Sequence, residues 1–398
     1  MPARIKALDY IRGLSILGIL MVNAIAFAQP FAVYSNPSVS LLPLSAADQW
    51  VWWLTETFFK DKFITLFTLL FGVSIYLVGR DNPPNVPLIK TPLFRRLAWL
   101  SVFGLLHGAL IWHGDILLHY AITGALFWRW RESSARNLLI MGLFLYLAGA
   151  AVTLIPEVWL SDHGAIAAAH PDIAPIIVAM RGSFIDSLTQ NMATWASGEA
   201  PEVINYLPTS LGLMMIGLGL FKSGILKGNA TQRNYRMWIG VGVVSLGLIG
   251  WQSWQMLAEG FPFPRAFGIF RIANTLLCLP VALGYAGLLI LLGRLRLGAV
   301  LLYPLSCAGR MAFTNYLTQS LIMTAIFYGG RDLGFGFGGH FGEMNHAALV
   351  PIVAAIWAGQ LAFSTVWMSV LRYGPFEWGW RCLTYARWMS IGKAESVA

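Results

Sequence analysis

Long apolar stretches recur along the chain, and short polar segments separate them. A helix needs about 20 apolar residues to cross the hydrocarbon core of a bilayer. The stretches are continuous and lack the alternation that a membrane β-barrel would show. The pattern predicts an all-α, polytopic membrane bundle of about ten spans, at 11–29, 62–79, 97–113, 115–130, 137–155, 203–221, 237–257, 269–293, 311–328 and 347–371.

The composition is typical of a protein whose main solvent is lipid. Hydrophobic residues make up 57% of the 398 residues and charged residues only 11%, whereas soluble domains carry about a quarter charged residues. A formal net charge of +9 would suggest nucleic-acid binding in a soluble protein, but here the basic residues follow the order of the spans. We therefore expect no nucleic-acid partner.

Basic residues gather in alternate connections between the predicted spans. Arg4 and Lys6 precede the first span, and Lys393 follows the last one. The positive-inside rule then places both termini in the cytoplasm. The longest connection, 156–202, is mostly acidic, and we expect it to be extracytoplasmic and to hold short helices on the membrane surface. The chain as a whole, 1–398, is predicted to form a single integral membrane domain.

The densest group of polar residues in apolar surroundings lies in the segment LLHGALIWHGDILLHY. His107 stands in an apolar run, Asp115 follows the break at Gly114, and His119 shares a helical face with Asp115. A carboxylate beside an imidazole fixes its tautomer, as a general base requires. We predict His107 and Asp115 as catalytic residues and His119 as a pocket residue. The alternatives are a structural histidine, an Asp115 that caps the next helix, and metal binding, although the spacing fits no standard zinc motif and we predict no metal.

Other polar residues interrupt or border the apolar stretches and are candidates to line a pocket. Asp61 and Lys62, at the outer edge of the second span, are also typical of a cluster at the membrane interface, where long side chains reach the lipid headgroups. Asn315 and Gln319, in the ninth span, are four residues apart, a spacing typical of side chains that form hydrogen bonds to a neighbouring helix. The candidates are Asn23, Asp61, Lys62, Arg271, Asn315 and Gln319.

Arginines on the predicted cytoplasmic side are candidates to hold a phosphorylated cosubstrate. Guanidinium groups bind phosphate through paired, charge-assisted hydrogen bonds. Arg12, in the first span, is also explained as a basic anchor that pairs with Asp9, one helical turn earlier. The candidates are Arg12, Arg95, Arg96 and Arg310.

Several segments resemble the YeiB family, bacterial membrane proteins of unknown function within a broader group of transmembrane acyltransferases. The resemblance implies a ten-span core with a pocket through the membrane. It also implies transfer of an acyl group from cytosolic acyl-CoA to a sugar or a related acceptor. Members of the group carry a histidine near the end of the first span or in the loop after it. This chain has Asn23 at that position instead. We therefore expect His107, supported by Asp115, to take the place of that histidine. The matching segments are RIKALDYIRGLSILGILMVN at 4–23, KFITLFTLLFGVSIYL at 62–77, RRLAWLSVFGLLHGALIWHGDILLHYAITG at 95–124, GRMAFTNYLTQSLI at 309–322 and YGPFEWGWRCLTY at 373–385.

Residues and resemblance together predict a membrane-bound acyltransferase of the bacterial inner membrane, with acyl-CoA as cosubstrate. The expected partners are membrane lipids and a polar acceptor such as a glycan or a lipid-linked sugar, and a homodimer is an open alternative. A transporter or flippase of a lipid-linked or small polar solute would use the same residues without covalent chemistry and is the alternative function. A scaffold or sensor that uses the acidic connection is a third.

Overall fold

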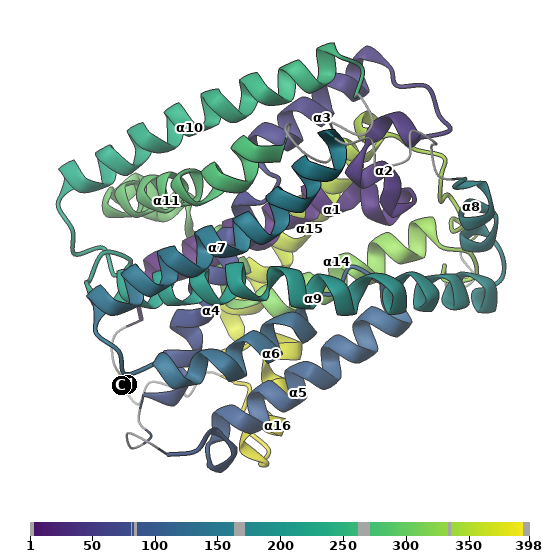
Figure 1. Ribbon diagram of the computed structural model, residues 1–398. Helices are drawn as coiled ribbons and strands as arrows, with labels where there is room; N and C mark the ends of the chain where they lie inside the picture. The colour runs from purple at the N-terminus through teal and green to yellow at the C-terminus, as the bar shows by residue number, and fades with distance from the viewer. Residues whose placement is uncertain are drawn as a thin grey trace.

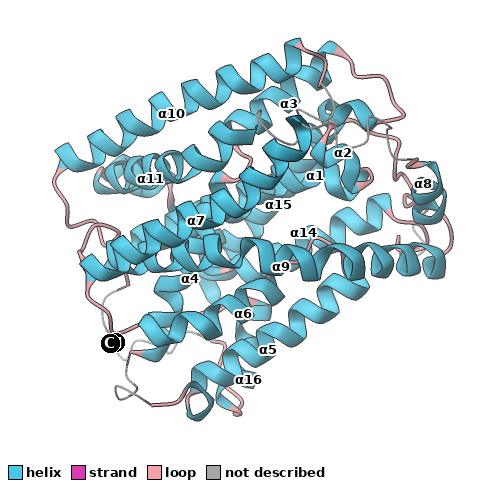
Figure 2. Ribbon diagram, viewed as in Figure 1, coloured by secondary structure: helices cyan, strands magenta, loops and turns pink. Residues whose placement is uncertain are grey.

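The computed structural model describes residues 4–80, 82, 86–162, 172–261, 271–332 and 336–392, which are mostly helical (Figures 1 and 2). Helices satisfy their backbone polar groups internally, as lipid requires. An isolated bridge joins Leu371 to Gly392. The helices are α1 (Lys6–Ala28), α2 (Phe31–Ser35), α3 (Ala46–Phe58), α4 (Lys62–Gly79), α5 (Pro92–Leu106), α6 (Leu117–Phe127), α7 (Ala135–Asp162), α8 (Ala174–Arg181), α9 (Phe184–Lys222), α10 (Gln232–Ala258), α11 (Ile272–Arg294), α12 (Arg296–Leu301), α13 (Tyr303–Arg310), α14 (Ala312–Phe327), α15 (His346–Val370) and α16 (Pro375–Tyr385).

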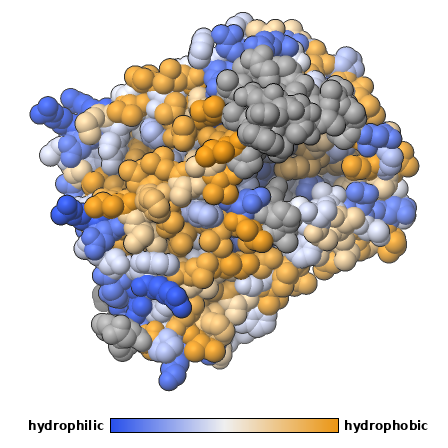
Figure 3. Space-filling view, in the orientation of Figure 1, coloured by the Kyte–Doolittle hydropathy of each residue, from blue (hydrophilic) through white to orange (hydrophobic). Residues whose placement is uncertain are grey.

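Eight segments of the described chain are long and apolar enough to cross a membrane. They account for all the predicted spans except the fourth and the ninth, which are shorter helices, α6 with 11 residues and α14 with 16. Hydrophobic side chains cover much of the face over α5, α7 and α9, and hydrophilic ones gather toward its ends (Figure 3). The chain is therefore a multi-pass helical membrane protein, whereas ten crossings and cytoplasmic termini stay predictions.

Three segments differ from the predicted pattern. Residues 46–58, expected to lie in a connection, form α3, which begins with a capping box between Ser45 and Asp48. Residues 184–202, expected as short surface helices, run straight into the following span as part of α9. Its 39 residues give a length of about 58 Å, which exceeds the hydrocarbon thickness of about 30 Å. The third span ends its regular helix early, because a π turn follows Leu106.

Helix α1 lies inside the bundle and contacts α4, α13, α14 and α15, while α7 packs along α9 and α10 along α11 (Figure 1). Two glycines permit the contact between α1 and α13. A Cβ built on Gly13 or on Gly309 would lie 2.0 Å from a backbone carbonyl oxygen of the other helix. Small residues allow this close backbone approach between helices in a membrane. The contact places Arg12 and Arg310, the neighbours of these glycines, at the same end of the bundle.

Candidate functional site

The π turn at His107–Ile111 ends the third span and carries an imidazole at its first position. Such turns are frequent at functional sites, because they interrupt the regular helical hydrogen bonding. Asn191 of α9 donates to two carbonyl oxygens of this turn, each at 2.9 Å. Arg331 donates to two others, at 2.9 and 2.8 Å. These donors satisfy carbonyls at the interrupted helix end and hold the chain reversal in place.

The reversal brings His107, Asp115 and Ser320 into one hydrogen-bonded chain. The imidazole Nδ1 lies 2.9 Å from Oδ1 of Asp115, and Nε2 lies 2.9 Å from Oγ of Ser320. The second carboxylate oxygen accepts the backbone N–H of Leu118 at 2.9 Å, so Asp115 caps α6 and also orients the imidazole. The three residues of the chain are at most 5% exposed. An ionised carboxylate only accepts hydrogen bonds, so with Asp115 ionised the proton lies on Nδ1, and Nε2 is then the nitrogen that can accept the hydroxyl proton of Ser320.

Two adjacent cavities, which share part of their walls, lie on the Asp115 side of this chain. The wide cavity, of about 670 Å³, lies between the end of α1 and the start of α4, and Asn23 and Lys60 are in its wall. The middle cavity, of about 200 Å³, extends past His119 and Tyr120. Both walls combine polar and apolar side chains. The residues that line both are Asp61, Ile64, Asp115, Ile116, Thr153, Tyr206 and Arg271.

Asp61 combines an unusual backbone conformation with a place in the wall of both cavities. Its φ of 66° lies in the left-handed region, which a residue other than glycine seldom adopts. Its carboxylate accepts a hydrogen bond from Asn274 at 2.9 Å. The next residue, Lys62, is fully buried, bonds to Asn274 and to the carbonyl of Glu56, and lines none of the described cavities. Strained residues often occur at functional sites, which supports Asp61 as a pocket residue and gives Lys62 a supporting position.

The other histidines of the predicted cluster lie on the cavity walls. His113 lines the wide cavity, and its backbone N–H donates to Asn191 at 2.9 Å. His119 lines the middle cavity, where its Nε2 lies 2.7 Å from Oγ of Ser210. Within the described ranges, no group of three His, Cys, Asp or Glu side chains is placed to hold a metal ion.

A third cavity, the arginine cavity, has a volume of about 180 Å³ and lies at the opposite end of the bundle from the wide cavity. Three of the four predicted arginines are in its wall: Arg12 from the start of α1, Arg96 from the start of α5 and Arg310 from the end of α13. Arg12 donates to the hydroxyl of Ser74 at 3.2 Å. The structure thus brings together guanidinium groups from three separate segments of the chain.

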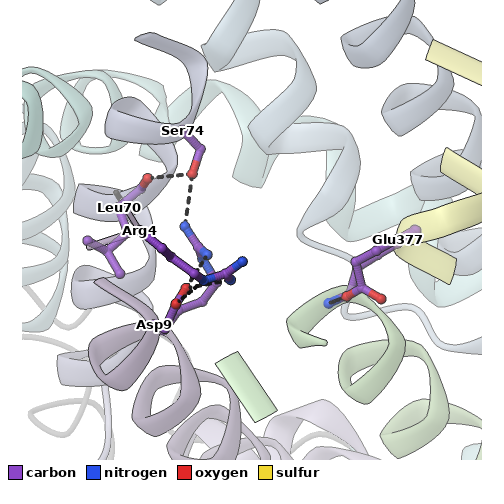
Figure 4. A network of polar contacts seen from close by, with 7 residues as sticks. Arg4, Asp9, Leu70, Ser74 and Glu377 are labelled. Carbon is purple, nitrogen blue, oxygen red and sulfur yellow. Dashed lines mark hydrogen bonds and ion pairs between the residues drawn. The ribbon is translucent and has the colours of Figure 1, made fainter. Parts of the chain in front are cut away.

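Glu377 of α16 is the carboxylate in the wall of the arginine cavity. Figure 4 shows it apart from the ion pair of Arg4 and Asp9, with which it makes no drawn contact. It accepts the N–H groups of Phe313 and Thr314 at 2.7 and 3.1 Å and the Thr314 hydroxyl at 2.5 Å, so it caps α14. Burial raises the pKa of Glu377 above its ordinary value. Three guanidinium groups share the wall with this one carboxylate, so positive charge predominates in the cavity, as anion binding requires.

The hydrogen-bonded chain lies in a partition between the arginine cavity and the other two. Tyr316 lines the arginine cavity, and its ring centroid lies 5.0 Å from that of His107. Asp115 lines both other cavities. Ile116 and Tyr120 line the arginine cavity and the middle cavity. His107 itself lines none of the three cavities, so a substrate reaches the imidazole only after a wall residue moves.

Besides Lys62, three predicted pocket or cosubstrate residues lie outside the described cavities. Arg95 is exposed and outside the arginine cavity, because neighbouring residues of a helix point about 100° apart. Asn315 donates to Ser364 at 3.2 Å, and Gln319 donates to Gln360 at 2.8 Å. These two amides therefore join α14 to α15, which was the alternative interpretation of their spacing, and neither lines a described cavity.

Gly104 controls how closely α5 approaches the Asp115 carboxylate. A Cβ at this position would lie 2.4 Å from the backbone nitrogen of Leu118 and 2.8 Å from Oδ2 of Asp115. We expect Gly104→Ala to lower the free energy of unfolding by about 1–3 kcal/mol, since an extra methyl in a tight contact forces the helices apart. Thermal unfolding in detergent measures this. Gly359→Ala, where the added Cβ meets open space, is the control, and equal melting temperatures for both variants would contradict the expectation.

The helical bundle, with polar cavities on either side of a buried Asp–His–Ser chain, defines a multi-pass membrane protein with an internal polar site. The chain belongs to the YeiB family. It is 33% identical over 392 residues to the uncharacterized protein YeiB of Escherichia coli (strain K12), with 95% of each chain covered. It is 30% identical over 415 residues to the uncharacterized protein YxaH of Bacillus subtilis (strain 168), with 99% of this chain and 97% of the relative covered. Residues 220–387 match a family described as "Protein of unknown function (DUF418)". None of these descriptions states an activity.

Proposed function

We propose that the protein is a membrane-bound acyltransferase that moves an acyl group from cytosolic acyl-CoA to a sugar or another polar acceptor at or across the membrane. The observation that carries the proposal is the Asp115–His107–Ser320 chain, which lies between an arginine cavity and two polar cavities. In this proposal the donor and the acceptor occupy different cavities and react at the partition.

The arginine cavity is the proposed donor site. Arg12, Arg96 and Arg310 would pair with the phosphates of coenzyme A through charge-assisted hydrogen bonds. The positive-inside rule puts this end of the bundle in the cytoplasm, where acyl-CoA is found. At about 180 Å³ the cavity is smaller than ordinary ligand pockets of about 300–1,000 Å³. It therefore suits the thioester arm, and the nucleotide would stay at the rim.

His107 is the proposed general base. Its Nε2 is the basic nitrogen, because the hydrogen bond from Nδ1 to Asp115 fixes the tautomer. The same carboxylate stabilises the imidazolium that forms once Nε2 has taken a proton. Burial of the pair excludes water and strengthens this electrostatic support.

The wide cavity is the proposed acceptor site. Its volume of about 670 Å³ has room for a polar group such as a sugar, and Asn23, Asp61 and Arg271 provide polar contacts in its wall. A glycan or lipid-linked sugar would enter here beside membrane lipids. We place the protein in the bacterial inner membrane, since the relatives named above are bacterial. A homodimer is compatible with this arrangement.

Release of coenzyme A tests the proposal. Purified protein is mixed with acetyl-, octanoyl- or palmitoyl-CoA, with and without a lipid and glycan extract of bacterial membranes, and free thiol is followed. We expect thiol release from at least one thioester, and faster release with the extract. Intact acyl-CoA at every chain length, with extract present, would contradict an acyltransferase.

A transporter or flippase is the second candidate, and the series of three cavities that share wall residues is the observation that favours it. Such a protein would bind its solute from one side and release it on the other without breaking a bond. Saturable binding of acyl-CoA with no thiol release, together with uptake of a labelled solute into proteoliposomes, would favour this function.

A further inference from the structure

We propose that Ser320 is the nucleophile of the reaction and carries the acyl group through the partition as a serine ester. This inference rests on the proposed acyl transfer and adds to it a covalent intermediate and a further catalytic residue.

The geometry around Ser320 is the first argument. Its Oγ lies 2.9 Å from Nε2 of His107, whose Nδ1 lies 2.9 Å from Asp115. A weakly acidic hydroxyl becomes a nucleophile when a base lies within hydrogen-bond reach and a third group orients that base. All three parts are present here, in the order carboxylate, imidazole and hydroxyl, and the turn before α6, the π turn and α14 hold them in position.

The position of Ser320 between the cavities is the second argument. The neighbouring Tyr316, one helical turn earlier on α14, lines the arginine cavity and contacts the His107 ring, whereas Asp115 lines the cavities on the other side. Direct transfer would require the thioester and the acceptor to reach the partition at the same time, one from each side. A serine in the partition can instead receive the acyl group from one side and release it to the other.

The chemistry balances in two steps. In the first step, Ser320 Oγ attacks the thioester carbonyl while His107 Nε2 takes the hydroxyl proton. The C–S bond then breaks, and the proton on Nε2 passes to the departing thiolate. In the second step, an acceptor hydroxyl attacks the serine ester and gives its proton to Nε2. The bond between the acyl carbon and Oγ breaks, and Ser320 recovers the proton. No group is oxidised or reduced.

The test uses full-length protein in detergent with octanoyl-CoA and no acceptor. Because the site is buried, hydrolysis of the ester is slow, and we expect a burst of up to one thiol per chain. Mass spectrometry should find one octanoyl group on the peptide that contains Ser320. In Ser320→Ala both the burst and the adduct should be lost. Ser320→Cys should still become acylated, now as a thioester that neutral hydroxylamine cleaves.

Ser245→Ala is the matched control, since this serine of α10 is also buried and lines none of the described cavities. It should keep the burst of the wild type. Full turnover by a folded Ser320→Ala protein, or wild-type turnover with no adduct at Ser320, would overturn the covalent step and leave direct acyl transfer standing. If Ser320→Ala does not fold, the position of the wild-type adduct decides. No thiol release from wild type, even with a membrane extract as acceptor, would reject the acyltransferase itself.

Discussion

Replacement of His107 by glutamine is expected to reduce acyl transfer by about 10²–10⁴-fold, the usual contribution of a general base. Glutamine has a similar reach, so it preserves much of the packing between Asp115 and Ser320, but it cannot take up a proton in the reaction. The effect should fall on kcat rather than on KM, because His107 lines none of the described cavities and so contributes little to binding of the donor. Thiol release per folded protein measures it.

The control for this variant is His346→Gln, which changes another buried histidine that lines none of the described cavities. Both variants should insert in the membrane and elute from a sizing column as the wild type does. Turnover of His107→Gln equal to that of His346→Gln would show that the imidazole at position 107 is structural, and the proposed mechanism would then be wrong.

Replacement of Arg96 by glutamine is expected to raise KM for acyl-CoA by about 10- to 100-fold with kcat nearly unchanged. A hydrogen bond to a charged phosphate contributes about 1.5–3 kcal/mol, which corresponds to that range. Arg96 also stacks on Trp380, with the guanidinium carbon 3.7 Å from the ring centroid, so its side chain is held at the cavity wall before the donor arrives. Steady-state kinetics at varied acyl-CoA concentration separates KM from kcat.

Arg95 supplies a matched control for this experiment, because it is the adjacent residue, has the same charge and lies outside the arginine cavity. Arg95→Gln should shift KM less than about twofold, since salt largely screens an exposed charge that lies outside the cavity. Equal shifts in the two variants would mean that only the overall positive charge of this surface matters. The arginine cavity would then lose its proposed role as the donor site.

Much of the fold could be predicted from the sequence, because lipid requires a spanning segment to be helical. The second predicted span, 62–79, coincides with α4, and every other predicted span falls on a helix. The grouping of Arg12, Arg96 and Arg310 in one cavity wall also agrees with the sequence. Each of them lies near a helix end, on the side of the bundle where the basic connections gather. Helix α3 was not predicted, because its mixture of tryptophan and acidic residues resembles a connection more than a span.

The pairing of side chains was less predictable. His107 and Asp115 were grouped because only a short break separates them in the sequence. Ser320 was not predicted, since it lies 213 residues from His107 and a serine in a membrane helix commonly bonds to its own backbone. Asn315 and Gln319 showed that their helix has a polar face, but the sequence could not show that this face meets α15 rather than a cavity.

Transfer of a label in inside-out membrane vesicles tests the central claim most directly, because in the predicted topology the arginine cavity then faces the added donor. Vesicles from cells that produce the wild type or His107→Gln receive octanoyl-CoA labelled in the acyl group, and the label in lipid, glycan and protein fractions is compared. The account predicts label in a membrane acceptor with the wild type and a reduction of about 10²-fold or more in the variant. Label that stays on coenzyme A in both preparations, or that moves equally well in both, would contradict it.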